Sequence, residues 1–307
     1  MSPLTTYWHE FEKDNWVHIR EWESINDTRG IIHILHGMME HSGYYHDWAV
    51  ELTKLGWTVV SHDHPGSGFT VMKECGNDHL PFDGKDKLCL VTQIVDHWIR
   101  KKYSNKKVIR YGHSMGAFVA LNSFLTGNEV DGIILTGTSF EKSFVLNLQK
   151  YFIKMLAKVY KTSSTAKIAD LITFLPLNQK FKQTKTKYDW ITRNKDALNK
   201  YINDPLCGNV VSWGYFYSLN ELLLTCINEK KWKAVKYLPK SLILTGEFDA
   251  LSNFGKKISS YIMQNEPCFK NTKTITIPGS RHKIEYDQNQ HLVISEISNF
   301  LEGFYEH

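Results

Sequence analysis

The pentapeptide Gly-His-Ser-Met-Gly at positions 112–116 constrains the fold more than any other stretch of this chain. The apolar run 108–111 precedes it and is typical of a buried strand, whereas residues 117–121 after it predict a helix. A serine between two glycines at such a junction needs a turn so tight that neighbouring side chains would collide. The pattern therefore predicts that Ser114 has a strained backbone and projects its hydroxyl above the end of a sheet.

Strand and helix patterns alternate along the first third of the sequence and return after residue 235. Predicted strands cover 17–22, 30–37, 58–63, 107–111, 132–137, 241–246 and 273–278, and predicted helices cover 44–55, 88–103, 117–121 and 288–303. Such alternation is typical of βαβ units in a mostly parallel sheet. Between 139 and 235 the strand pattern disappears. We therefore predict an α/β fold whose core domain, 1–138 and 236–307, is interrupted by a helical cap at 139–235.

The predicted cap is basic and the rest of the chain is not. Residues 139–235 contain 16 Lys and Arg against 7 Asp and Glu, although the net charge of the whole chain is only +5. Such a local excess argues against general nucleic-acid binding and favours a local anionic partner, with a solvated lysine-rich surface as the alternative. Lysines 150, 154, 158 and 161 lie at helical spacing, where like charges repel. We expect weak peripheral membrane association through this basic cap.

Composition and cysteine usage are those of an ordinary globular protein. Apolar residues make up 42% of the chain, and no stretch approaches the roughly 20 apolar residues of a membrane span. The first residues lack the basic and apolar blocks of a signal peptide. Five cysteines (Cys75, Cys89, Cys207, Cys226 and Cys268) are widely spaced and form no Cys-x-x-Cys motif. We expect a cytoplasmic protein that associates with membranes peripherally.

Two residues complete a catalytic set with Ser114. A serine hydroxyl needs a base to remove its proton and an acid to orient that base. Asp249 follows the predicted strand 241–246, and His282 follows the predicted strand 273–278. Both therefore lie at carboxyl ends of parallel strands, where such sheets bind ligands. Glu247 is an alternative acid, although the chain order and loop position favour Asp249.

Backbone amides near Ser114 complete the expected chemistry. An oxyanion needs hydrogen-bond donors, and we expect them to be the amides of Met115, after the nucleophile, and Met38, in the loop after the early strand. Met38 alternatively packs in the core. Histidine pairs such as His62 and His64, or His41 and His46, have no acid or cysteine at a recognisable ligand spacing. We therefore expect no metal ion and no cofactor.

These motifs resemble the monoacylglycerol lipase and lysophospholipase branch of the serine α/β-hydrolases over nearly the whole chain. The resemblance rests on the loop 36–42, the Asp-His-Pro-Gly-Ser-Gly turn at 63–68, the elbow 112–116, and the cap segments 188–193 and 204–207. It implies an α/β-hydrolase fold. It also implies Ser114 as nucleophile, Asp249 as acid, His282 as base, and Met38 and Met115 as oxyanion donors. Ala117 replaces a glycine that is common in the family, and Ser67 replaces a frequent histidine.

Aromatic and aliphatic residues of the cap suggest an apolar substrate. They line a pocket or, equally, pack the cap onto the core: Phe140, Phe144, Leu148, Phe152, Phe174, Leu175, Trp213, Tyr215, Phe216 and Tyr217. As substrate contacts we predict Phe144, Leu148, Phe174, Trp213 and Phe216.

The expected function is that of a serine hydrolase cleaving a single fatty-acyl ester, as a monoacylglycerol lipase or a lysophospholipase-like carboxylesterase. Its partner is then a small lipid ester. A proline-type aminopeptidase uses the same fold and triad but needs cap carboxylates to hold the substrate's amino terminus. A non-catalytic ligand-binding relative is the third alternative.

Overall fold

The computed structural model describes residues 3–70 and 78–304, so Cys75 lies outside the described residues. Within them, strands β1 to β8 form one sheet in the order β1-β2-β4-β3-β5-β6-β7-β8. The strands are β1 (Leu4–Glu12), β2 (Asn15–Trp22), β3 (Gly30–Leu35), β4 (Thr58–His62), β5 (Lys107–His113), β6 (Gly132–Thr136), β7 (Lys240–Gly246) and β8 (Thr272–Ile277). β1 and β2 are antiparallel to their neighbours, and all other pairs are parallel.

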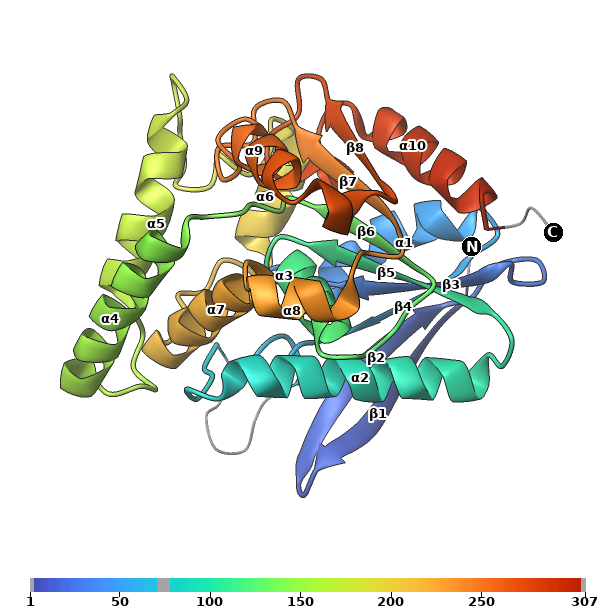
Figure 1. Cartoon of the computed structure of the whole chain (residues 1–307), viewed down its shortest axis with the longest axis horizontal. Coiled ribbons are helices and arrows are strands. Elements are labelled where there is room, and N and C mark those ends of the chain that lie inside the picture. The colour runs from blue at the N-terminus through green and yellow to red at the C-terminus, as the bar shows by residue number, and fades with distance from the viewer. Residues whose placement is uncertain (1–2, 71–77, 305–307) are drawn as a thin grey trace.

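Helices cover both faces of the sheet (Figure 1). The α-helices are α1 (His46–Thr53), α2 (Gly84–Lys102), α3 (Met115–Leu125), α4 (Ser143–Tyr160), α5 (Lys167–Gln179), α6 (Lys195–Asn203), α7 (Trp213–Cys226), α8 (Glu229–Val235), α9 (Lys256–Gln264) and α10 (Gln290–Glu302). Short 3₁₀ helices are η1 (Ser42–Tyr45), η2 (Glu266–Phe269) and η3 (Ile284–Tyr286). The predicted mostly parallel sheet flanked by helices is confirmed.

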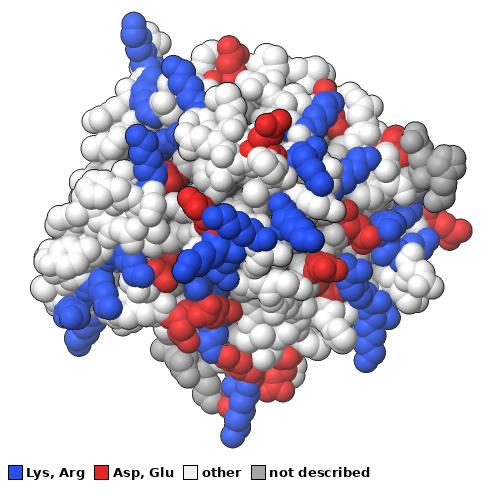
Figure 2. Space-filling model, in the orientation of Figure 1, with Lys and Arg blue, Asp and Glu red and all other residues white. Residues whose placement is uncertain are grey.

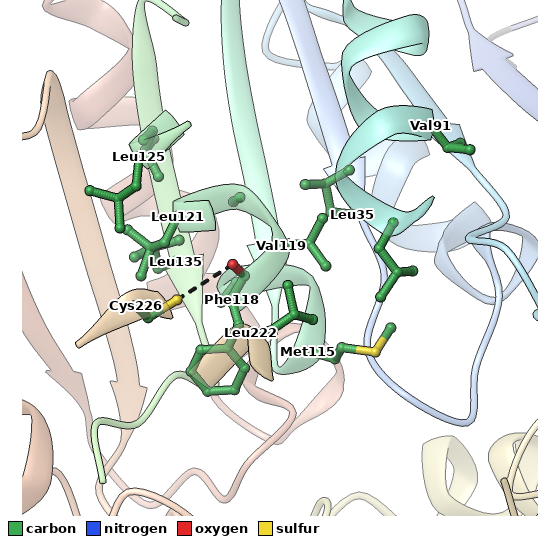
Figure 3. Close-up of a cluster of buried hydrophobic side chains, with 14 of the residues drawn as sticks. Leu35, Val91, Met115, Phe118, Val119, Leu121, Leu125, Leu135, Leu222 and Cys226 are labelled. Atoms are coloured by element: carbon green, nitrogen blue, oxygen red, sulfur yellow. Dashed lines mark hydrogen bonds between the residues drawn. The ribbon is translucent and has the colours of Figure 1, made fainter. Parts of the chain in front are cut away.

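Two apolar clusters pack the helices onto the two faces of the sheet. One cluster joins the sheet to α2, α3, α7 and α8, and the other joins it to α1 and α10. Helix α3 lies within the first cluster, where Met115, Phe118 and Leu121 pack among side chains of β3 and β6 and against Leu222 and Cys226 of α7 (Figure 3). Because nearly all of α3 is buried, its N-terminus is held firmly against the sheet.

The chain between β6 and β7 is helical, and it contains α4 to α8. Helices α4 and α5 lie beyond the sheet, on the left of Figure 1, whereas α7 packs against α2, α3 and α4. The division into a core domain and a cap at 139–235 stays a prediction.

Strand β1 was not predicted, because its side chains are mostly exposed and give no apolar pattern. The predicted helix 44–55 is replaced by η1 followed by α1, which ends at Thr53. Among the described residues, no helix combines the length and the apolar character needed to cross a bilayer.

Candidate active site

Ser114 occupies a strained turn between β5 and α3. Its φ is 52° and its ψ is −116°, a conformation that non-glycine residues rarely adopt. The Ser114 amide donates a 2.9 Å hydrogen bond to the Thr136 carbonyl, which anchors the turn to β6. A Cβ on Gly112 would lie 2.5 Å from the Gly116 carbonyl oxygen, and one on Gly116 would lie 1.9 Å from the Leu35 carbonyl oxygen. Both flanking positions therefore require glycine.

His282 and Asp249 are in direct contact above the ends of β8 and β7. The Nδ1 atom of His282 lies 3.1 Å from Oδ1 of Asp249, and both side chains are buried. The Leu251 amide donates to the same Asp249 oxygen at 2.9 Å and fixes the carboxylate. Glu247, the alternative acid, is exposed and accepts the Gly279 amide hydrogen bond instead. Of the two candidate acids, Asp249 is therefore the one whose carboxylate contacts the His282 ring.

Ser114 and His282 line the same cavity. Among the described residues, no hydrogen bond joins the Ser114 hydroxyl to the His282 ring. Such bonds often tighten only when substrate binds. Gly137 lies beside this ring with φ of 56°, and a Cβ there would lie 2.8 Å from Cε1 of His282. Glycine at 137 thus leaves the space that the imidazole occupies.

Met38 and Met115 both line the cavity that Ser114 and His282 line. Within the described chain, neither amide donates to another protein group. The preceding amide, that of Gly37, donates to Oε1 of Glu40 at 2.5 Å. Met39 has φ of 60°, and its carbonyl accepts bonds from the Tyr201 hydroxyl and the Gly208 amide. These bonds fix the loop while leaving the two predicted oxyanion donors available.

A buried ion pair joins this loop to the loop that carries His282. Lys283 Nζ contacts Oε2 of Glu40, and the side chains are at most 4% exposed. The Tyr45 hydroxyl donates to Glu40 at 2.7 Å. Burial by itself raises the pKa of Glu40, but the charges of Lys283 and His113 and the hydrogen bonds from Lys283 and Tyr45 lower it to about 2. Sequence reasoning missed this pair because its members are 243 residues apart.

The cavity has a volume of about 680 Å³ and a mostly apolar wall. All five predicted substrate contacts line it, namely Phe144, Leu148, Phe174, Trp213 and Phe216. They differ in exposure: Trp213 and Phe216 are buried, whereas Phe144 is 78% exposed. The wall therefore includes both buried side chains of α7 and solvent-exposed side chains of α4 and α5.

Trp190 covers the His282 ring and was not singled out from the sequence. The ring centroids of Trp190 and His282 are 4.9 Å apart, and Phe174 stacks on Trp190 with 5.6 Å between their ring centroids. The Lys283 amide donates to the Ile191 carbonyl at 2.8 Å, which holds this segment against the histidine loop. An apolar ring over the imidazole limits the access of water to it. The resemblance of segment 188–193 to related caps is the only signal in the sequence for this contact.

Helix α4 exposes its apolar face instead of burying it. Phe144, Tyr151 and Val159 are more than 60% exposed, whereas only Leu146 and Ala157 of this helix are buried. Figure 2 shows the surface over α4 and α5, on the left, as largely uncharged with lysines at its margins. Of the four lysines predicted to repel one another, Lys150 pairs with Glu221 of α7 at 2.6 Å. Exposed apolar surface of this extent is typical of an interaction site.

The fold and the comparison with known families define the class of this protein as a serine α/β-hydrolase. The model of the family described as "Serine aminopeptidase, S33" matches residues 26–289, and the chain belongs to that family. It is therefore a hydrolase, as the sequence predicted.

Several of the similar proteins are named as lipases or esterases. The chain is 25% identical to a monoglyceride lipase homolog of Monkeypox virus, covering 95% of this chain and 96% of the relative. It is 27% identical to the monoglyceride lipase of Homo sapiens over 76% of this chain and 69% of that protein. Two solved structures share its fold. A carboxyl esterase from Bacillus coagulans has a TM-score of 0.85 at 21% identity, with 99% of each chain covered. A monoglyceride lipase from Saccharomyces cerevisiae has a TM-score of 0.75 at 16% identity, covering 99% of this chain and 96% of that chain.

Proposed function

We propose that this protein hydrolyses a single fatty-acyl ester, with monoacylglycerol as its leading substrate and lysophospholipid second. The observation that carries the proposal is the apolar cavity lined by Ser114, by His282 and by Met38 and Met115, whose backbone amides donate to no other group among the described residues. An apolar wall favours the binding of a long acyl chain, because each Å² of apolar surface removed from water contributes about 25 cal/mol to the binding free energy. The names of the relatives agree with this substrate class.

In the proposed mechanism His282 donates its Nδ1 proton to the hydrogen bond with Asp249, so its Nε2 lone pair is free to accept a proton. The Ser114 oxygen attacks the ester carbonyl carbon while His282 takes the hydroxyl proton. The amides of Met38 and Met115 stabilise the oxyanion. His282 then protonates the leaving alcohol as the C–O bond breaks and an acyl-serine forms. Water, deprotonated by the same imidazole, cleaves the acyl-serine to release the fatty acid.

The aminopeptidase alternative is disfavoured by the charges in the cavity. Three carboxylates line it within the described residues, namely Glu40, Glu141 and Asp170. Glu40 pairs with Lys283, and Glu141 pairs with Lys257. Two of the three are thus engaged by lysines rather than placed to hold a substrate's amino group.

A substrate panel tests the proposed function. We expect the wild-type protein to hydrolyse monoacylglycerols and, more slowly, lysophospholipids of matched chain length. Amino-acid arylamides should be cleaved far more slowly. Their amino group would need a cluster of carboxylates, and two of the three carboxylates that line the cavity are already paired with lysines. Release of fatty acid or arylamine is measured, and a fluorophosphonate that blocks all turnover confirms that one serine is responsible. Faster cleavage of arylamides than of any acyl ester would reject the proposal.

We also propose that the α4–α5 surface docks on anionic membranes during substrate capture. Apolar side chains there enter the interface while lysines near an anionic surface contribute about 1 kcal/mol each. Changing Lys150, Lys154, Lys158 and Lys161 to glutamine should weaken co-sedimentation with anionic liposomes roughly 100-fold. This 100-fold figure counts the contributions of only three lysines, because Lys150 is already paired with Glu221.

The matched control changes four lysines at and after α8: Lys230, Lys231, Lys233 and Lys236. Helix α8 lies away from α4 and α5 in Figure 1, and removal of these lysines should leave liposome binding nearly unchanged. Equal losses in the two quadruple variants would mean that net charge, and not this surface, governs binding. Binding unaffected by the α4 changes would count against the membrane proposal.

A further inference from the structure

Three side chains with metal-ligand chemistry meet beside the loop that carries Met38. His41 belongs to this loop, and Asp204 and Cys207 belong to the turn after α6. One ligand atom from each, a ring nitrogen, a carboxylate oxygen and the thiol sulfur, lies within 4.8 Å of each of the others. His41 and Cys207 are buried, whereas the Asp204 side chain is 22% exposed. Asp204 therefore opens this cluster to solvent.

Backbone hydrogen bonds hold the three residues in place without using all of their ligand atoms. The Leu206 amide donates to Oδ1 of Asp204 at 2.9 Å, which turns Oδ2 toward His41. The Cys207 amide donates to the Asp204 carbonyl, so acid and thiol share one turn. The next amide, Gly208, donates to the Met39 carbonyl at 2.9 Å and docks this turn on the loop of His41. The cluster is thus preorganised by the fold.

The hydrogen bonds within the cluster leave one buried nitrogen unsatisfied. Nε2 of His41 lies 3.0 Å from Oδ2 of Asp204 and donates to it. Nδ1 of the same ring is buried and has no hydrogen-bond partner within the described residues. An unpaired buried polar atom costs about 1–3 kcal/mol. The Cys207 thiol also donates to Asp204, so a single carboxylate satisfies both of its neighbours.

We propose that His41, Asp204 and Cys207 form a binding site for a divalent cation of the zinc class, with water as a fourth ligand. Imidazole nitrogen, carboxylate oxygen and thiolate sulfur are the ligands that Zn²⁺ takes in proteins, and three protein ligands with one water is a common set. Magnesium and calcium prefer all-oxygen sets and would bind poorly beside a thiolate.

Binding of the cation exchanges one proton of the protein for the metal ion. The Cys207 S–H bond breaks, its proton leaves to solvent, and the thiolate binds the cation. The His41 proton moves through solvent from Nε2 to Nδ1, so the ring stays neutral and Nε2 becomes a ligand. One proton is therefore released per cation, and affinity falls as pH falls.

The bound cation would tie the cap turn to the loop of the predicted oxyanion donor. A ligand that binds only the folded chain also stabilises it by mass action. The sequence gives no ligand spacing for this site because His41 and Asp204 are 163 residues apart.

Titration of the full-length, reduced protein with Co²⁺ tests the site directly. We expect one equivalent to produce a thiolate-to-cobalt charge-transfer band, to release one proton to a pH indicator, and to be displaced by Zn²⁺. Cys207→Ser should abolish the band. Asp204→Asn and His41→Gln should each weaken binding at least about 10-fold. Cys268→Ser, which removes a thiol far from this turn in the sequence, should bind as the wild type does.

Zn²⁺ should also raise the thermal unfolding midpoint of the wild type and of Cys268→Ser but not that of Cys207→Ser. Absence of a charge-transfer band in the wild type, or the same band in Cys207→Ser, would overturn the proposal. Should Cys207→Ser fail to fold, the proton count on the wild type and the Asp204→Asn affinity decide it. The charge-transfer band, the proton count, the cation affinity and the unfolding midpoint do not depend on substrate turnover. The test of the cation site is therefore independent of the proposed ester hydrolysis.

Discussion

Ser114→Ala is expected to lower monoacylglycerol hydrolysis roughly 10⁶-fold, to the level left when a serine-protease nucleophile is removed. The reason is that no other oxygen at the elbow can attack the carbonyl carbon while the two amides of Met38 and Met115 bind the oxyanion. Covalent labelling by a fluorophosphonate should disappear in the same variant. Rates under substrate saturation and labelling followed by electrophoresis measure both effects.

Ser123→Ala is the matched control for this experiment. It removes the same oxygen from Ser123, a buried serine of helix α3, which follows the elbow. Ser123 accepts a hydrogen bond from Asn128. The control should keep both labelling and turnover, with a stability loss of about 1 kcal/mol. Labelling that survives in Ser114→Ala would show that another residue is the nucleophile. Loss of labelling in both variants would indicate damage to α3 instead.

The elements that position this site could be predicted because their signals are local. Buried parallel strands give continuous apolar runs, and the elbow needs glycine at 112 and 116 for steric reasons that the structure makes explicit. Asp249 was favoured over Glu247 by chain order. The structure separates the two acids by burial, which depends on how the loop after β7 packs and is not encoded in any short pattern.

The remaining parts of the site depend on contacts between distant segments. Trp190 reaches His282 only because the segment before α6 folds back over the loop after β8. Helix α4 is a case where the sequence pattern was not enough. Its apolar periodicity predicts an apolar face but not what packs against that face, and most of the face is exposed. Period and spacing reveal an amphipathic helix, whereas the partner of each face is a tertiary property.

Lys283→Met should destabilise the protein by about 3–5 kcal/mol, because it leaves the Glu40 carboxylate buried without its counterion. Lys283 is 1% exposed, its ammonium contacts Glu40, and it lies 4.5 Å from the Tyr44 ring centroid and 4.6 Å from that of Tyr45. Urea unfolding followed by circular dichroism measures the loss. Lys273→Met is the control, since Lys273 forms an exposed pair with Glu296 and should matter by less than about 1 kcal/mol.

The double variant Glu40→Gln/Lys283→Met distinguishes an unpaired charge from lost packing. Glutamine keeps a carbonyl oxygen for the Gly37 amide and the Tyr45 hydroxyl, so the double variant should recover much of the stability lost in Lys283→Met. A double variant as unstable as Lys283→Met would instead attribute the loss to the lysine's packing among tyrosine rings. The two outcomes separate electrostatic and apolar roles for one side chain.

The pH dependence of the unfolding free energy gives an independent check that the Glu40–Lys283 ion pair stabilises the protein. The native pKa of Glu40 is about 2, below the ordinary value of 4.5, so the unfolded chain takes up the proton first as pH falls. The stability contributed by Glu40 is therefore complete above pH 4.5 and is lost progressively as pH falls toward 2. Without Lys283 the native pKa rises and this loss should shrink. The wild type and Lys283→Met should thus converge in stability under acid, and a gap that stays constant from pH 7 to pH 3 would contradict an ion-pair role. Convergence would mean that the charge joining the loop of Met38 to that of His282 acts only while Glu40 is ionised.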